Sequence, residues 1–430
     1  MDDPGGTAVS GLGAVDHLVE QLWAPALASG DIRIQAGTPG SRHQRGGWSD
    51  VETYLALPSV GSATMLLPAA NREVLARSLL NFRRLRARGP STQRALLGWT
   101  TGAGLPLPFP TVRIQTRAPR GERPELPTER VARDLGLPRV HASLGVRTAA
   151  NRKATLQLVD DAGDPVGFAK FAWDPASAAA VTREADVLAR LAGGAHDLRT
   201  PRLLARGSWH GHPYLVSEPL PSGARRPDPA VLPRAQELFA LCPIVRHDTV
   251  DRTGQLVALR RRIETLQEAG AETGLLARAV DLLDRIDRID VPVAARWHGD
   301  LTAWNCARDD QQRLWCWDWE STEADAVAGL DAVHWAATDL TLRGHRYGGA
   351  VLAAAAEKAA PLLTAAGHSR TTRAAVPVLY VAILVERAVA LAVGNGGWDE
   401  GWLSQSEAFE LVRAAGAMVP ALRDSRVDQH

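Results

Sequence analysis

The stretch Trp297–Glu320, WHGDLTAWNCARDDQQRLWCWDWE, decides the fold of this chain. Its opening triplet HGD ends in Asp300, and Asn305 follows five residues later. A polar turn then leads into a short alternating run that ends in Asp318. Two short strands joined by a polar turn predict a β-hairpin, and such a hairpin brings Asn305 and Asp318 to the same end.

These three side chains predict a site for phosphoryl transfer. Amide and carboxylate oxygens are the ligands that Mg²⁺ prefers, so we assign Asn305 and Asp318 as metal ligands. We assign Asp300 as the catalytic carboxylate, which would orient and deprotonate an acceptor hydroxyl. Mg²⁺ and a nucleoside triphosphate are therefore the expected cofactors.

The charge balance argues against nucleic acid and membrane partners. The 430 residues contain 49 Lys and Arg against 48 Asp and Glu, a net charge of +1. This balance gives no broad positive field. The most apolar stretch, residues 376–393, carries Glu386 and Arg387 in its middle, which predicts a buried helix. With an acidic start and no apolar leader after it, we expect a cytoplasmic protein.

The three cysteines, Cys242, Cys306 and Cys316, form no C-x-x-C pair. Their number and spacing predict neither a disulfide framework nor a structural zinc site. This agrees with a reducing compartment.

The residue pattern upstream of the hairpin predicts a small antiparallel β lobe with one helix. Period-two alternation and turn residues indicate the strands, and an apolar stripe indicates the helix. The expected strands are residues 140–146, 154–159, 166–173, 203–208 and 214–217, and the expected helix is 177–191.

Three domains follow from these changes of pattern. Residues 1–125 form an N-terminal α/β unit of unknown role, with strands near 51–57 and 63–67 and a helix near 69–88. Residues 126–220 form the small lobe. Residues 221–430 are expected to be mostly helical and interrupted by one strand pair, the hairpin above.

From Pro127 onward the chain resembles the aminoglycoside phosphotransferase family, the small-molecule branch of the protein-kinase-like fold. The resemblance rests on H-G-D-x-x-x-x-N at residues 298–305 and on D-W-E at 318–320. It implies a bilobal α+β fold and ATP-dependent transfer of a phosphoryl group to a small molecule. No segment matches a protein-kinase activation segment closed by A-P-E, so the expected acceptor is a sugar, amino sugar or amino alcohol.

The resemblance also assigns three residues of the small lobe to nucleotide binding. Lys170 lies on the third strand of the lobe, where the family's phosphate-binding Lys belongs, and Glu184 lies on the apolar face of the following helix. A buried carboxylate needs a partner, and Lys170 is the natural one. The alternative is a surface Lys and a Glu paired with a nearby Arg. Glu218 falls where the family's hinge binds adenine through backbone groups.

The chain departs from the expected pattern in the loop at residues 143–153. This loop has no G-x-G-x-x-G. Arg147, Arg152 and Lys153 would supply charge in place of backbone amides, or they form a solvated turn. The missing glycines keep a second hypothesis open, a catalytically inactive kinase-fold binding or regulatory module.

For the acceptor the sequence offers only hints. Glu320, Asp325 and Asp331 are acidic and close to the metal site, and Asp331 resembles a structural Asp of the family. The segment 398–402, WDEGW, would suit a sugar, but core and rim packing is the plainer interpretation. The acceptor and the oligomeric state stay open.

Overall fold

The computed structural model describes residues 12–38, 47–81, 85, 88–119, 121–146, 153–191, 199–398 and 401–419. The chain divides into two compact units. The first contains Met1–Gly193 and Thr200–Arg225, and the second contains Gly194–Arg199 and Arg226–His430. The chain is therefore an α+β protein with two units, and each unit is described by itself.

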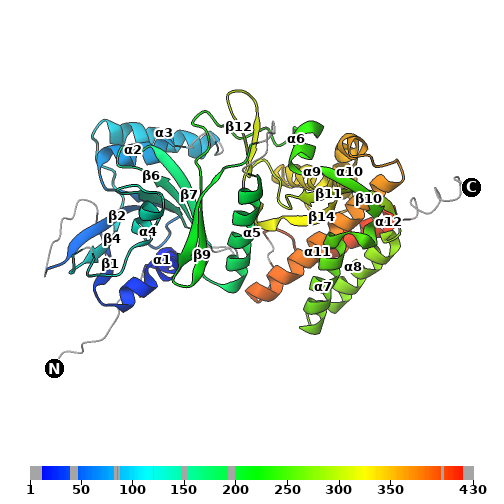
Figure 1. Cartoon of the computed structure of the whole chain (residues 1–430), viewed down its shortest axis with the longest axis horizontal. Coiled ribbons are helices and arrows are strands. Elements are labelled where there is room, and N and C mark those ends of the chain that lie inside the picture. Colours follow the sequence, from blue (N-terminus) through cyan, green and yellow to red (C-terminus); the bar gives the residue numbers. More distant parts are fainter. Residues whose placement is uncertain are drawn as a thin grey trace, which may run out of the picture. The chain divides into compact units, whose positions relative to one another are not determined.

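The first unit is built on one nine-stranded sheet with helices on its faces (Figure 1). Its helices are η1 (Gly13–Val15), α1 (Asp16–Ala28), α2 (Arg72–Leu80), α3 (Arg88–Gly102), α4 (Pro127–Asp134) and α5 (Pro175–Leu191). Its strands are β1 (Ile32–Gly37), β2 (Ser49–Leu57), β3 (Met65–Pro68), β4 (Thr111–Thr116), β5 (His141–Gly145), β6 (Ala154–Val159), β7 (Pro165–Phe171), β8 (Leu203–Trp209) and β9 (His212–Ser217). The strand order is β1-β4-β2-β3-β5-β6-β7-β9-β8.

The predicted segments 1–125 and 126–220 share this sheet. They join where β3 pairs with β5 through Met65↔Gly145 and Leu66↔Leu144. One core cluster also contains residues of both segments, from Leu22 of α1 to Val216 of β9. The sheet is continuous because β3 and β5 each have an edge that would otherwise be unpaired.

Strands β5 to β9 and helix α5 lie within two residues of the positions predicted from the sequence. The helix expected near 69–88 is wrong in extent, because α2 ends at Leu80 and Asn81 has an extended backbone. Strands β1 and β4 and helices α1 and α4 were not predicted. Strand β4 is buried at every position, so it shows no alternation.

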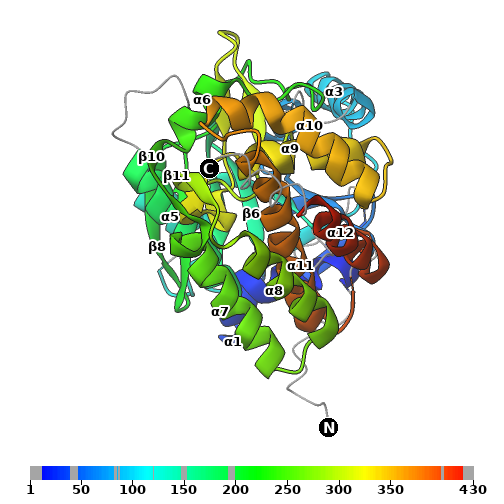
Figure 2. The same cartoon turned by 90° about the vertical axis from the view of Figure 1, so that its right-hand side faces the viewer.

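The second unit is mostly helical (Figure 2). Its helices are α6 (Ala235–Leu241), η3 (Val250–Arg252), α7 (Gly254–Glu268), α8 (Thr273–Ile286), η4 (Trp319–Ser321), α9 (Leu330–Leu342), α10 (Gly349–Ala365), η5 (Thr372–Ala374), α11 (Ala375–Asn395) and α12 (Gln405–Met418). Its strands are β10 (Ile244–Thr249), β11 (Asp290–Trp297), β12 (Cys306–Arg308), β13 (Leu314–Cys316) and β14 (Glu323–Val327).

The expected single strand pair is present as the hairpin β12-β13, but the sequence prediction missed a three-stranded sheet, β10-β11-β14. Strand β11 is buried along most of its length, so its apolar run lacks the alternation of a half-exposed strand. This sheet matters for the site because the HGD triplet follows β11 directly.

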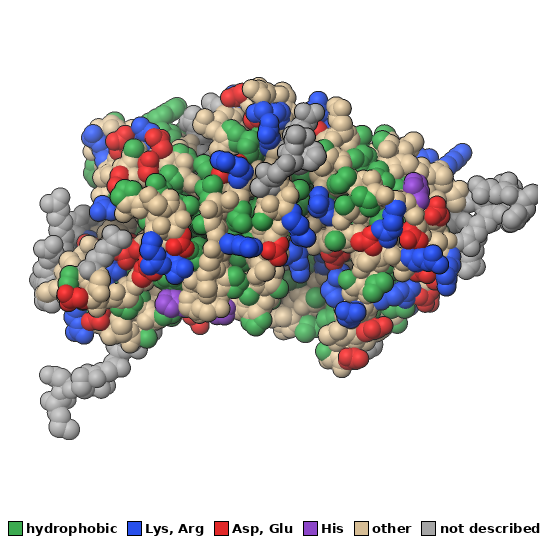
Figure 3. Space-filling model, viewed as in Figure 1, with side chains coloured by type: hydrophobic (Ala, Val, Ile, Leu, Met, Phe, Trp, Pro, Cys, Tyr) green, Lys and Arg blue, Asp and Glu red, His purple; other side chains and the backbone are tan. Residues whose placement is uncertain are grey.

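Helix α11 forms the centre of the second unit. The segment Thr372–Asn395 is long and apolar enough to cross a membrane by length and composition, and 78% of its most apolar window is buried inside the protein. Such burial is typical of a core helix. On the face drawn in Figure 3, basic and acidic side chains are interspersed, in agreement with the even charge balance.

Candidate active site

His298 ties the HGD loop to the hairpin of the second unit. Its Nδ1 accepts a hydrogen bond from the backbone N–H of Asp300 at 3.3 Å, and its Nε2 donates to the carbonyl of Trp317 at 3.1 Å. Both bonds suit a neutral ring with its proton on Nε2. Burial lowers the pKa of His298 and favours this neutral form. The loop and the residue before Asp318 are thus held together.

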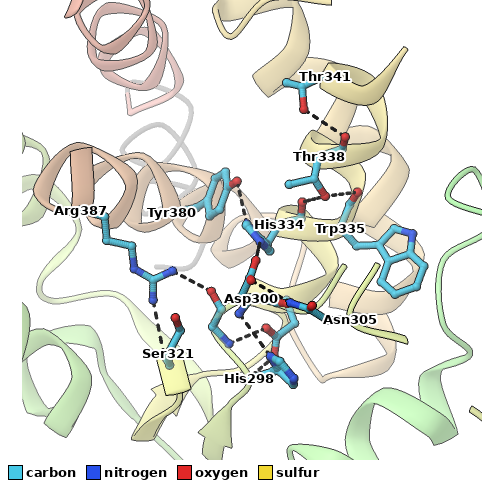
Figure 4. Close-up of polar contacts among 12 residues, drawn as sticks. His298, Asp300, Asn305, Ser321, His334, Trp335, Thr338, Thr341, Tyr380 and Arg387 are labelled. Atoms are coloured by element: carbon cyan, nitrogen blue, oxygen red, sulfur yellow. Dashed lines mark hydrogen bonds and ion pairs between the residues drawn. The ribbon is translucent and has the colours of Figure 1, made fainter. Parts of the chain in front are cut away.

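Gly299 allows the loop to turn against η4. It has φ +86°, and a Cβ there would lie 2.1 Å from the carbonyl oxygen of Ser321. The Arg387 guanidinium, from α11, donates to the carbonyl of Gly299 at 2.7 Å (Figure 4). It also lies over the ring of Trp297, 5.0 Å from the centroid. Only glycine fits at this position without a shift of the backbone.

Asp331, near the start of α9, anchors the same loop. Its carboxylate accepts from the backbone N–H groups of His298 at 2.8 Å and of Gly299 at 3.0 Å. The side chain is buried, and two charge-assisted hydrogen bonds stabilise it there. Asp331 therefore has the contacts of a structural residue.

The Asp300 carboxylate is held by two donors. Asn305 Nδ2 donates to Asp300 Oδ2 at 2.8 Å and to the Asp300 carbonyl at 3.0 Å. His334 Nε2 lies 3.1 Å from Asp300 Oδ1 (Figure 4). The Asp300 side chain nevertheless remains 34% exposed, so a bound hydroxyl can reach it. A fixed but accessible carboxylate can act as a general base.

His334 on α9 is a residue that sequence reasoning missed. Its Nδ1 lies 3.1 Å from the hydroxyl of Tyr380 on α11. Burial raises the pKa of Tyr380 well above its usual value and that of Tyr347 to about 12. Both phenols therefore stay protonated, and Tyr380 can donate to His334. No local motif marks His334, because its contacts come from three separate segments.

The hairpin places Asn305 and Asp318 at the same end. In the register of β12 and β13, Cys306 lies opposite Cys316. The backbone N–H of Trp317 donates to the carbonyl of Asn305 at 3.1 Å. Asp318 follows with φ +70°, in the left-handed region that Asp adopts more readily than most residues. This backbone turn directs the chain into η4 immediately after the strand.

Asn305, Asp318 and Glu320 carry side-chain oxygens of the kind that divalent cations prefer. Because Asn305 Nδ2 is used by Asp300, the oxygen Oδ1 is the atom of the amide that can bind a metal. Carboxylate oxygens of Asp318 and Glu320 lie within 4.8 Å of each other. Hard oxygen ligands of this kind suit Mg²⁺. Asp325, in contrast, forms an ion pair with Arg246 and accepts from Gly254 N–H at 2.7 Å, so its contacts are structural.

In the first unit, Lys170 and Glu184 form a buried pair. Lys170 Nζ donates to Glu184 Oε2 at 2.5 Å, and the two residues are 9% and 3% exposed. Lys170 lies on β7, and α5 packs against the neighbouring strand β9. Asp174 begins this helix by accepting from the N–H of Ser177 at 2.7 Å. The alternative of a surface Lys and a Glu paired with an Arg does not describe this arrangement.

The remaining predicted residues are placed as follows. Glu218, just after β9, accepts from Arg202 at 2.7 Å, and its backbone N–H donates to the Arg202 carbonyl at 2.8 Å. Lys153 is buried before β6. Arg147 and Arg152 lie outside the described residues, as do positions 399 and 400 of the WDEGW segment. The side chain of Trp398 lies near Glu272, at 3.4 Å.

No protein-family model and no curated protein matches the chain. Several solved structures do. A protein of Haemophilus somnus 129PT named a fructosamine-3-kinase has a TM-score of 0.40 and 12% identity, over 68% of this chain and 96% of that one.

A thermostable mutant of an aminoglycoside phosphotransferase has a TM-score of 0.44 and 14% identity, over 68% and 98% of the two chains. The GDP complex of an aminoglycoside 2'-phosphotransferase has a TM-score of 0.40 and 14% identity, over 65% of this chain and 91% of that one.

Proposed function

We propose that this protein is a kinase-fold enzyme that transfers the γ-phosphoryl group of ATP, or of another nucleoside triphosphate, to a hydroxyl of a small molecule. Sugars, amino sugars and amino alcohols are the acceptor classes. The observation that carries the proposal is the held but accessible Asp300 carboxylate, bonded to Asn305 beside the hairpin end that bears Asp318. These are the groups that phosphoryl transfer requires.

Each residue has a distinct role in the proposed reaction. Asp300 orients the acceptor hydroxyl and takes its proton as the new oxygen–phosphorus bond forms and the bond to the leaving diphosphate breaks. Asn305 Oδ1 and the Asp318 carboxylate would hold Mg²⁺, with Glu320 as a further oxygen donor nearby. The metal, when bound, supplies positive charge at the phosphates.

The first unit would bind the nucleotide. Lys170, oriented by Glu184, would neutralise charge on the α- and β-phosphates. The backbone near Glu218 would bind the base. The buried ion pair supports this assignment, because a Lys held in place by a carboxylate is pre-organised for phosphate.

Substitution of Asp318 tests the metal assignment. We expect Asp318→Asn to abolish Mg²⁺-dependent phosphoryl transfer, measured as ATP consumption against a panel of amino sugars, sugars and amino alcohols. The matched control is Asp310→Asn, because Asp310 is exposed in the turn of the same hairpin. Full activity in Asp318→Asn with an unchanged fold would end the metal assignment.

The second candidate is a kinase-fold binding or regulatory module without transfer activity. The absence of G-x-G-x-x-G at residues 143–153 favours it. Thermal stabilisation by Mg²⁺-ATP without ATP consumption over the whole panel would support the module. Acceptor-dependent ATP consumption that disappears in Asp300→Asn would support the enzyme.

A further inference from the structure

A cavity of about 520 Å³ lies in the first unit where the sheet changes from the N-terminal strands to those of the small lobe. Strands β3 and β5 pair only through Met65↔Gly145 and Leu66↔Leu144. Beyond these two pairs, residues 68–70 and 138–142 line the cavity from its two sides, and α4 lines it as well. Its volume is in the range of small-molecule sites, about 300–1,000 Å³.

This cavity is separate from the nucleotide-binding residues proposed above. It is lined by Val140, just before β5, and by His141 and Ala142 at the start of that strand, whereas positions 147–152 come after the other end of β5 in the sequence. Neither Lys170, Glu184 nor Glu218 lines it.

Glu52 gives the cavity an acceptor that lacks a cationic partner. Its carboxylate accepts from the hydroxyl of Tyr54 at 3.0 Å and from the hydroxyl of Thr128. Among the described residues, no Arg, Lys or His nitrogen lies within 4.0 Å of it. Burial raises the pKa of Glu52, and the two hydroxyl donors and the more distant charge of Arg123 only partly oppose this. A carboxylate in a cavity wall without an ion-pair partner is costly to desolvate, and a ligand cation would relieve that cost.

The cationic side chains that line the cavity contact carboxylates other than Glu52. Arg123 makes two hydrogen bonds to Glu129, each at 2.9 Å, and His141 lies 2.9 Å from Asp161. Arg139 lies 3.9 Å from the same Asp161 carboxylate. None of these three side chains forms an ion pair with Glu52, so its carboxylate can accept a cationic group of a ligand. The wall therefore offers one carboxylate for a cation, beside apolar side chains such as Val140.

We propose that this cavity binds a small organic amine, with its ammonium group on the Glu52 carboxylate. Such a ligand would bind across the joint between the N-terminal strands and the small lobe. The proposal does not depend on the phosphotransferase activity, because the residues that carry it take no part in the proposed reaction.

A matched pair of probes tests the charge. trans-2-Aminocyclohexanol and trans-cyclohexane-1,2-diol have the same ring and differ by an ammonium in place of a hydroxyl. In titration calorimetry with the full chain, we expect the amine to bind at least about tenfold more tightly than the diol, since hydrogen bonds to charged groups are the stronger ones. Glu52→Gln should remove this preference.

Glu73→Gln is the control, because Glu73 is an exposed carboxylate on α2 that does not line the cavity. It should keep the full preference. Methyl NMR of the wild-type chain gives a second measurement in case Glu52→Gln does not fold. The amine should shift the methyl resonances of Ala132 and Ala142, two buried lining residues. Equal or absent binding of both probes, or unchanged Ala132 and Ala142 resonances, would overturn the proposal.

Discussion

One imidazole determines how the proposed catalytic carboxylate is held. His334 Nε2 faces Asp300 Oδ1 at 3.1 Å, while its Nδ1 faces the Tyr380 hydroxyl at 3.1 Å. With the proton on Nε2, the ring donates to Asp300 and accepts from Tyr380. The three groups then form one chain of hydrogen bonds that ends on Asp300. In the proposed reaction, His334 is a positioning residue, because it acts through Asp300.

Loss of this donor should slow the chemical step. We expect His334→Ala to lower kcat by about tenfold to a hundredfold through misorientation of Asp300, with a small effect on the KM for ATP. His334→Gln should recover part of the rate, because its amide can donate to the same oxygen. The control is His345→Ala, at an exposed position. Equal kcat values for the Ala and Gln variants would contradict this role.

At position 299 the structure leaves no room for a side chain. We expect Gly299→Ala to destabilise the protein by about 2–5 kcal/mol, since the left-handed backbone and the collision with Ser321 both oppose a Cβ. Gly270→Ala has φ +76° and nothing within 4 Å, so it should cost only about 1–2 kcal/mol. Urea denaturation compares the two. Similar losses would show that the contact with Ser321 is unimportant.

At the scale of elements, Glu237 links α6 to the hairpin. Its carboxylate accepts from Arg308 of β12 at 2.8 and 3.1 Å, and from the Arg234 guanidinium at 2.5 Å. Burial alone would raise the pKa of Glu237, but the hydrogen bonds from Arg308 and Arg234 outweigh it and lower the pKa to about 2. The ionised form is therefore favoured by folding.

The contribution of Glu237 to stability should depend on pH. A pKa lowered from 4.5 to about 2 corresponds to about 3 kcal/mol. This stabilisation is complete above pH 4.5 and is lost as the pH falls toward 2, because a depressed folded-state pKa favours folding only while the group is ionised. Glu237→Gln should therefore lower the unfolding free energy at pH 7 and much less at pH 3.

Glu410→Gln is the control for this measurement. Glu410 pairs with Arg413 at 2.5 Å, but both side chains are exposed, so we expect a change below about 1 kcal/mol at either pH. A loss in Glu237→Gln that is the same at pH 7 and pH 3 would contradict the assignment to ionisation.

At the scale of the whole molecule, the N-terminal strands complete the sheet of the small lobe. Strand β3 covers the edge of β5, and residues of α1 such as Leu22 belong to the same core as Val216 of β9. The predicted boundary at residue 125 therefore divides a shared sheet and a shared core. An element that covers a sheet edge protects it from association with other chains.

Removal of residues 1–125 should make the remaining chain poorly soluble. The deletion exposes the β5 edge and part of the core, so we expect aggregation and loss of cooperative unfolding. Size-exclusion chromatography and thermal unfolding measure both effects. Leu66→Asp, a single change at the same joint, should act in the same direction because Leu66 is fully buried. A soluble truncated chain with the full-length midpoint would refute the shared core.

The local sequence pattern was enough to predict several strands, one helix and the hairpin. Strands β5 to β9 alternate or lie between turn residues, and α5 has an apolar stripe, so short windows reveal them. The hairpin turn between Arg308 and Leu314 similarly fixes that Asn305 and Asp318 lie at the same end of the hairpin. Strands buried on both faces, β4 and most of β11, lack alternation and were missed.

The sequence by itself determined which residues carry the proposed phosphoryl transfer, because Asp300, Asn305 and Asp318 lie within one short segment whose spacing reflects local geometry. The tertiary structure alone decided what orients them. His334 and Arg387 reach the HGD loop from α9 and α11, and Tyr380 of α11 contacts His334. The cavity at Glu52 forms where β3 and β5 separate. Contacts between segments far apart in the chain depend on packing of the whole core, and no local periodicity encodes them.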